Sequence, residues 1–256
     1  MNVNKEREGL ASHTPERELA ERSRRAFLTL GAAAVAGYGG WYWLRTRPGE
    51  GGLAGPFRRM LQFNERVAGT YYSPSHMAPV FPAARIQKMR VNGDLGLDDD
   101  FDAKTWRLAV NGLTGPGRLR PLTLADIRAL PKAEHTTQLK CIEGWSVVTH
   151  WAGARFSDFT AKFAPESAHA LYVGMQTPDE EYFVGLDMPS ALHPQTLLCY
   201  EMNGAPLSME HGAPLRLFTP VKYGIKSIKR VGTIIYSDER PRDYWAEQGY
   251  DWYAGL

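Results

Sequence analysis

Alternating apolar and polar positions mark a series of short strands in the second half of the chain. Residues 105–112 (TWRLAVNG) alternate in this way, and the run EHTTQLKC ends at Cys141. Further strand candidates are HALYVGMQ, EYFVGL, TLLCYEM, PLRLFTPV and RVGTIIYS. A period of two is typical of strands with one buried face. Asn203-Gly204, after TLLCYEM, predicts a tight hairpin turn.

Two stretches between these strands have helical spacing. Thr123 precedes LADIRAL, and Asp126 lies three residues on, which predicts a capped helix that ends before Pro131. In FSDFTAKF the phenylalanines share one helical face, and we expect Ser157 to cap that helix. These core candidates are Phe156, Phe159 and Phe163. Many short strands with a few brief helices predict a β-rich α+β domain.

The N-terminal region follows different patterns. Residues 1–25 are largely charged, and 26–44 form an apolar run rich in glycine and alanine. Residues 45–80 are rich in Gly, Pro, Arg and aromatic residues, and we expect an extended linker that begins to wrap the domain.

Arg24-Arg25, followed by Phe27-Leu28 and the apolar run, resembles a twin-arginine export signal. The alternative is a simple membrane anchor flanked by positive charge. Ala34-Val35-Ala36 fits a cleavage site, while the run up to Leu44 is close to the ~20 residues that span a bilayer. The sequence is thus compatible both with cleavage of this segment and with its retention as a membrane anchor.

Composition narrows the functional classes. The 256 residues suffice for one domain with its own core, and 43% hydrophobic with 23% charged residues is a globular balance. A net charge of +2 and a pI near 8.5 are too mild for a nucleic-acid binder, and no basic stripe is present. We therefore expect no nucleic-acid partner.

The chain has two cysteines, which could pair in an oxidising compartment. Cys199 lies in an apolar run, as an ordinary buried thiol does, whereas Cys141 lies where a strand turns into IEGWS. A thiolate is a soft metal ligand. No C-x-x-C, H-x-x-x-H or C-x-x-C-H motif completes a zinc, iron–sulfur or haem c site. If Cys141 binds a metal, a cofactor must supply the other ligands.

A basic region follows in EHGAPLRLFTPVKYGIKSIKR. Its cations alternate with Gly212 and Gly224, and exposed amides at glycine turns can cradle an anion. These cations are His211, Arg216, Lys222, Lys226 and Lys229. A solvated basic face is the alternative for any one lysine. Arg216, however, lies between Leu215 and Leu217, where a charge needs a partner such as a buried phosphate.

Gly144-Trp145-Ser146 raises the question of a hydrolase. The nucleophile elbow needs a second glycine two residues after the serine, and Val148 occupies that position. The sequence therefore does not have the nucleophile elbow of a hydrolase at this position.

Three stretches together resemble the sulfite oxidase fold family of molybdopterin enzymes, closest to the periplasmic methionine-sulfoxide reductase catalytic subunit type. They are LKCIEGWSVVTHWAG, HPQTLLCYEMNGAPLSMEHGAPLRLFTPVKYGIKSIKRV and, more faintly, FNERVAGT. The resemblance implies a mononuclear molybdenum held by Cys141 and by the dithiolene of one molybdopterin. Residues 81–240 would form the molybdopterin-binding catalytic domain, with 241–256 as an aromatic C-terminal strap or a partner-docking patch.

The resemblance also implies further cofactor contacts. Asn64 and Glu65 match early contacts, although the aromatic residue normally beside that glutamate is absent. Thr177 matches a pterin contact, and His211 stands where reductases usually have asparagine and sulfite oxidases histidine. The phosphate and pterin grip is matched by Arg216, Gly224, Ile225 and Lys226. The roles of His150, Trp145, Trp151 and Tyr223 stay open between pocket and packing.

The implied activity is oxygen-atom transfer, with reduction of a sulfoxide such as methionine sulfoxide favoured and electrons from a membrane haem b or quinol-linked partner. A sulfite oxidase-like activity is the alternative, disfavoured because the arginines that hold sulfite are missing around Cys141. No C-terminal immunoglobulin-like dimerisation domain is expected, which favours a monomer apart from the partner. A cofactor-free exported binding domain is the alternative from another class.

Overall fold

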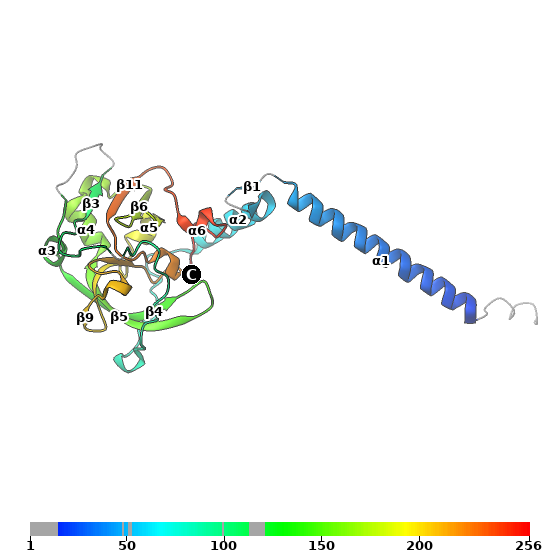
Figure 1. Ribbon diagram of the computed structural model, residues 1–256, viewed down its shortest axis with the longest axis horizontal. Helices are drawn as coiled ribbons and strands as arrows, with labels where there is room; N and C mark the ends of the chain where they lie inside the picture. The colour runs from blue at the N-terminus through cyan, green and yellow to red at the C-terminus, as the bar shows by residue number, and fades with distance from the viewer. Residues whose placement is uncertain (1–14, 48, 51–52, 99, 113–120) are drawn as a thin grey trace, which may run out of the picture. The chain divides into compact units, whose positions relative to one another are not determined.

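The computed structural model describes residues 15–47, 49–50, 53–98, 100–112 and 121–256. The chain divides into two compact units, one of residues 1–49 and 54–57 and one of residues 50–53 and 58–256. The first unit consists mainly of the long helix α1, Pro15–Arg45 (Figure 1). Among the helices of the described residues, none is both long and apolar enough to cross a membrane.

The second unit is built on two sheets. One is five-stranded in the order β10-β8-β5-β4, with β9 paired to β8, and the other is four-stranded in the order β3-β11-β6-β7. Their strands are β3 (Ala109–Asn111), β4 (Lys132–Lys140), β5 (Ser146–Arg155), β6 (Tyr172–Gln176), β7 (Phe183–Asp187), β8 (Leu197–Met202), β9 (Ala205–Pro206), β10 (Arg216–Phe218) and β11 (Thr233–Ser237). Two further short strands are β1 (Gly49–Glu50) and β2 (Leu53–Ala54). The strands expected from alternation are confirmed.

Short helices connect these strands. The α-helices after α1 are α2 (Gly55–Tyr71), α3 (Leu124–Arg128), α4 (Phe156–Phe163), α5 (Met188–Ala191) and α6 (Tyr244–Glu247). Single 3₁₀ turns are η1 (Ala83–Arg85), η2 (Pro165–Ser167), η3 (Met209–His211) and η4 (Gly224–Lys226). The fold is therefore the expected β-rich α+β class. Within the described residues no strands form a separate immunoglobulin-like sandwich.

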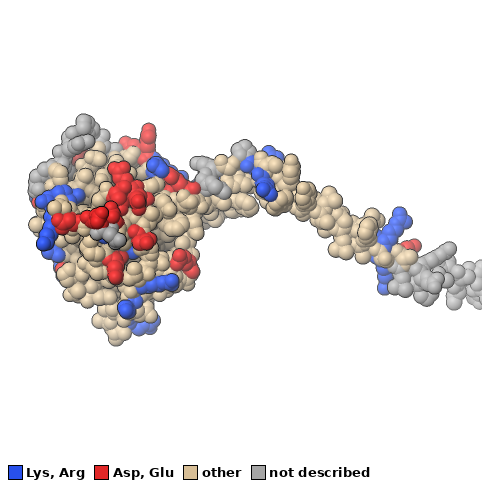
Figure 2. Space-filling model, in the orientation of Figure 1, with Lys and Arg blue, Asp and Glu red and all other residues tan. Residues whose placement is uncertain are grey.

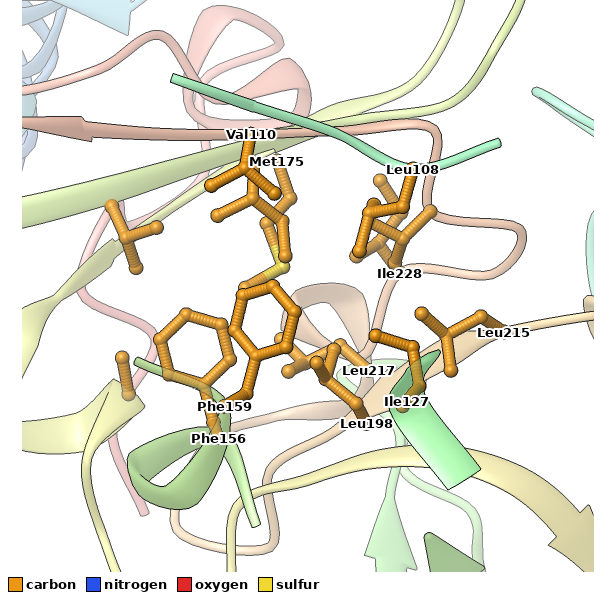
Figure 3. Close-up of a cluster of buried hydrophobic side chains, with 14 of the residues drawn as sticks. Leu108, Val110, Ile127, Phe156, Phe159, Met175, Leu198, Leu215, Leu217 and Ile228 are labelled. Carbon is orange, nitrogen blue, oxygen red and sulfur yellow. The ribbon is translucent and has the colours of Figure 1, made fainter. Parts of the chain in front are cut away.

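The main core lies between the two sheets. Val110 of β3 and Met175 of β6 belong to the same buried cluster as side chains from the other sheet, such as Leu198 of β8 and Leu217 of β10 (Figure 3). These side chains are at most 2% exposed, and burial of each contributes about 1.5–3 kcal/mol. The predicted core residues Phe156 and Phe159 are fully buried here, and Phe163 packs against them. This core fixes the sheets that carry the site.

The predicted start of α3 is confirmed. Thr123 Oγ1 accepts a hydrogen bond from Asp126 N, and the Asp126 carboxylate accepts one from Thr123 N at 2.8 Å. This capping box satisfies two amides that the helix leaves unpaired. The Asn203-Gly204 turn between β8 and β9 is also confirmed, with positive φ at both residues.

The predicted cap of α4 is wrong. The helix begins at Phe156, so Ser157 lies inside its first turn, and the preceding Arg155 makes no side-chain cap. β5 runs directly into α4, and Phe156 N donates to Thr196 O at 3.0 Å. Burial of the Phe156 ring, rather than a capping side chain, sets the start of the helix.

The expectation of an extended segment over 45–80 is wrong for Gly55–Tyr71, which form α2. Apolar residues lie there three and four positions apart, as Met60 and Leu61 do after Phe57, which is a helical period. Pro56 lies in the first turn, where its missing N–H costs nothing. The flanking glycines and arginines obscured this period.

Surface charge is mixed on the second unit. On the face shown in Figure 2, acidic side chains gather over the centre and basic side chains lie around them. That face carries no continuous basic stripe of the kind that tracks a nucleic-acid backbone.

Candidate functional site

A pocket of about 170 Å³ opens where the β4–β5 hairpin meets η4 and the segment that precedes it. It brings together five residues predicted from the sequence, Cys141, Arg216, Gly224, Ile225 and Lys229. Most of its wall is apolar or aromatic, and its cations are Arg90, Arg216 and Lys229. A thiol and several cations therefore share one cavity.

Cys141 lies in the turn directly after β4. Its N–H donates to Trp145 O at 2.8 Å, and its carbonyl accepts from Gly144 N at 3.1 Å. Gly144 has φ +88°, which glycine adopts readily, so the chain can reverse within a few residues. The Cys141 side chain is buried at the edge of the pocket, and burial raises the pKa of its thiol. A bound metal ion would hold it as a thiolate.

Cys199 differs, as expected from the sequence. It is fully buried within β8, is not bonded to Cys141, and its thiol pKa is strongly raised by burial. It serves as a packed core side chain.

Arg216 is a buried cation in this pocket, only 2% exposed. Its two Nη atoms donate to His211 O and Ser227 O, each at 3.0 Å, and Nε has no partner among the described residues. The guanidinium lies 4.8 Å from the centroid of the Trp151 ring. Burial lowers the Arg216 pKa to about 10. Among the described residues no carboxylate forms an ion pair with the Arg216 guanidinium, and its hydrogen-bond acceptors are two neutral carbonyls.

Lys229 adds a second cation to the same wall. Its Nζ donates to Asn92 O at 2.9 Å and Gly93 O at 2.8 Å, which are neutral carbonyls. Burial, followed by repulsion from Arg216, lowers the Lys229 pKa to about 8. A bound anion would relieve the cost of both cations.

Gly224 lets η4 approach the strand that leads to Cys141. A Cβ at this position would lie 3.0 Å from Leu139 Cδ2 and 3.3 Å from Lys140 O. Tyr182 fixes the next residue, because its hydroxyl donates to Ile225 O at 2.6 Å. The pocket thus combines the soft ligand Cys141 with two cations that favour an anion, Arg216 and Lys229, beside closely packed backbone. This combination fits an anionic organic cofactor that binds a metal.

Five other predicted residues are not among the lining residues of this pocket. Asn64 is exposed on α2, and Glu65 forms an ion pair with Arg240 at a second pocket. Thr177 Oγ1 donates to Asp179 Oδ1 at 2.5 Å and accepts from Tyr182 N at 3.1 Å. Their cofactor roles stay predictions.

The remaining two are His211 and Lys226. His211 is buried, its carbonyl accepts from Arg216, and its Nδ1 has no partner within the described part of the chain. Burial, followed by the Arg216 charge, lowers its pKa. Lys226 directs its ammonium away from the pocket, to Gly185 O and Asp243. Its neighbours Ile225 and Ser227, but not Lys226, line the cavity.

The residues left open are also placed. Trp145 lines the pocket, whereas Trp151 is fully buried and stacks on Phe218 with centroids 4.8 Å apart. His150 Nδ1 lies 2.9 Å from Thr136 Oγ1, on β5 away from the cavity, and Tyr223 N donates to Ala254 O.

Sequence reasoning missed several lining residues. They are Met89, Asn92, Leu95, Tyr182, Trp245 and Tyr250. The density of aromatic residues in 241–256 was the one signal available, since Tyr244, Trp245 and Tyr250 pack edge to face there. Nothing in the sequence pattern connected that segment to Cys141.

Comparison with known proteins agrees with this chemistry. The model of the family described as "Oxidoreductase molybdopterin binding domain" matches residues 95–245, more than half of the chain. "Putative protein-methionine-sulfoxide reductase subunit YedZ1" of Azospira oryzae is 34% identical over 199 residues, covering 77% of this chain and 74% of that protein.

Two further relatives are named "Protein-methionine-sulfoxide reductase catalytic subunit MsrP". The Campylobacter jejuni protein is 32% identical over 63% of this chain, and the Xanthomonas campestris protein is 36% identical over 55%. The chain spans 60% and 47% of their lengths. Among solved structures, the sulfane dehydrogenase SoxCD of Paracoccus pantotrophus superimposes with a TM-score of 0.48 and 18% identity, over 65% of this chain and 46% of that one.

The predicted family is thus confirmed by the family match over 95–245 and by relatives with more than 30% identity. The chain belongs to the oxidoreductase molybdopterin-binding domain family and is an oxidoreductase of that type.

Proposed function

We propose that this chain is an exported enzyme in which Cys141 ligates the molybdenum of one molybdopterin and which reduces a sulfoxide such as methionine sulfoxide. The proposal is carried by one observation. A buried guanidinium without a carboxylate partner, Arg216, shares a pocket with a lone thiol, Cys141. The names of the relatives support the sulfoxide as substrate.

The residues of the pocket have three roles in this proposal. The Cys141 thiolate holds the metal, while Arg216 and Lys229 neutralise the anionic part of the cofactor. Tyr182 keeps η4 in position through its bond to Ile225 O. For the other predicted contacts, Asn64, Glu65, Thr177, His211 and Lys226, we retain the roles that the family resemblance implies.

When bound, the molybdenum cofactor supplies oxygen-atom transfer coupled to electron transfer. Reduction of a sulfoxide breaks the sulfur–oxygen bond, consumes two electrons and two protons, and releases a thioether and water. The apolar wall of the pocket limits the water around the reacting sulfur. The electrons come from a membrane haem b or quinol-linked partner, and Arg24-Arg25 support export by the twin-arginine route.

Metal and pterin content test the cofactor assignment. We expect about one molybdenum and one pterin per chain in protein purified from the envelope fraction. Cys141→Ala should lose most of the molybdenum. Cys199→Ala is the matched control, since it removes the other buried cysteine, and it should retain the metal. Unmodified protein without molybdenum and pterin would overturn the proposal.

A substrate panel tests the reaction. With a reduced dye as electron donor, we expect turnover of methionine sulfoxide in peptides. The sulfite oxidase-like alternative predicts oxidation of sulfite with a dye acceptor, and sulfite turnover alone would decide for it. An intact fold that binds neither cofactor nor substrate would favour the cofactor-free binding domain.

A further inference from the structure

Trp145 lies beside the candidate metal ligand at the mouth of the pocket. The Cys141 N–H bond to Trp145 O closes the turn between them, so the two residues are positioned together. Both line the cavity, and Trp145 is half-buried, with one part of its ring packed against the core cluster that contains Met89. A substrate bound in this cavity therefore lies beside both residues.

Two exposed side chains hold the indole. Glu143 Oε2 accepts a hydrogen bond from Trp145 Nε1 at 2.9 Å, and the Arg90 guanidinium carbon lies 5.4 Å from the ring centroid. A tryptophan needed only for packing gains little from contacts on its solvent side. Contacts on that side instead fix the direction of the ring at the entrance.

The rest of the entrance is suited to an apolar chain. Leu95 and Ile142 line the same cavity, and so do Trp245 and Tyr250. Aromatic rings contact the sulfur and methylene groups of methionine-like side chains favourably. A small dianion such as sulfite has no alkyl group to pack against these apolar and aromatic side chains.

We infer that Trp145 is a specificity-determining residue, which binds the alkyl and sulfur part of a methionine sulfoxide side chain, and that Glu143 positions its indole. This inference rests on the proposed function and deepens it. Glu143 acts through the hydrogen bond to Nε1, and no proton transfer by Glu143 is involved.

The first test compares Trp145→Ala with Trp145→Phe in the cofactor-loaded enzyme. Loss of the aromatic face should raise KM for a methionine sulfoxide peptide about tenfold, with kcat within about twofold, while Phe, which keeps an aromatic face but has no Nε1–H, should restore only part of the affinity. Calorimetric Kd values without an electron donor should rise in parallel. Tyr71→Ala, an exposed aromatic residue of α2 outside the pocket, is the control and should change nothing. Molybdenum content should be unchanged throughout.

A second test isolates Glu143. Glu143→Ala should raise KM about fivefold, and Glu143→Gln, whose amide oxygen still accepts from Nε1, should stay within about twofold of the unmodified enzyme. In a Trp145→Phe background, which has no Nε1–H, Glu143→Ala should add nothing.

The outcomes separate the inference from the proposed function. If the enzyme reduces sulfoxides but Trp145→Ala leaves KM and Kd unchanged, or lowers kcat alone, the inference is wrong and the function stands. An additive effect of Glu143→Ala in the Trp145→Phe background overturns the positioning role. If no sulfoxide is bound or reduced by loaded protein, both fall together.

Discussion

Lys226 Nζ lies 2.5 Å from Asp243 Oδ2, and neither side chain is more than 2% exposed. Nζ also donates to Gly185 O at 2.9 Å, and the same Asp243 oxygen accepts from Gly185 N at 3.1 Å. The pair thus connects η4 to β7 and to the segment before α6. Burial lowers the pKa of Lys226, and the Asp243 carboxylate opposes this shift. The Lys226–Asp243 pair thereby stabilises η4, which forms part of the wall of the pocket.

We therefore predict a large loss of stability from Lys226→Met. Removal of one partner leaves Asp243 as a buried carboxylate without its ion pair, which costs about 3–5 kcal/mol. Urea unfolding followed by far-UV circular dichroism measures the change. The double variant with Asp243→Leu should recover much of the loss, because no unpaired charge remains buried. A double variant as unstable as the sum of the single ones would contradict this account.

Arg216→Met should separate cofactor binding from folding. The change removes a buried charge without an ion-pair partner, which favours folding, but leaves His211 O and Ser227 O without donors at about 1–3 kcal/mol each. We expect a net change within about 2 kcal/mol in protein without cofactor, and a loss of molybdopterin of more than about tenfold. Arg128→Met, an exposed arginine on α3, controls for loss of positive charge. Full cofactor content in Arg216→Met would exclude an anion at this site.

The lowered pKa of Lys229 predicts that the stability of the folded protein depends on pH. Its folded-state pKa of about 8 lies below the 10.5 of a free lysine, so between these values the unfolded chain binds more protons. Stability must rise with pH across this window, and the unfavourable contribution of the buried charge is complete below pH 8. Thermal melts of cofactor-free protein from pH 7 to 10 should show this rise relative to Lys229→Met. Cofactor-loaded protein should not show it, since an anion beside Lys229 restores the pKa. Parallel curves for the two cofactor-free proteins would contradict the prediction.

The sequence predicted what depends on local pattern, and the rest required the tertiary fold. Period-two strands, the Thr123 capping box and the thiol at the end of β4 could all be read from neighbouring residues. The pairing of Arg216 with carbonyls rather than with a carboxylate could not be read in this way. It depends on how β10 lies against His211 of η3 and Ser227 after η4. The direction of the Lys226 side chain was missed for the same reason, since Asp243 lies 17 residues away. Trp245 reaches the pocket through the packing of the C-terminal segment, which no alternation encodes.

Gly153 offers a test of the sheet that carries Cys141. It lies at an irregularity in the pairing of β5 with β8, and a Cβ there would overlap Leu198 O and come within 2.7 Å of Cys199 Cα. Both obstacles are backbone atoms that a rotamer change cannot move, so Gly153→Ala should cost about 3 kcal/mol or more and reduce soluble yield. Gly69→Ala in α2 is the matched control, because its Cβ meets nothing within 4 Å. There alanine should be neutral or stabilise by up to about 1 kcal/mol. Equal unfolding midpoints for the two variants would show that the close approach of β5 and β8 is wrongly placed.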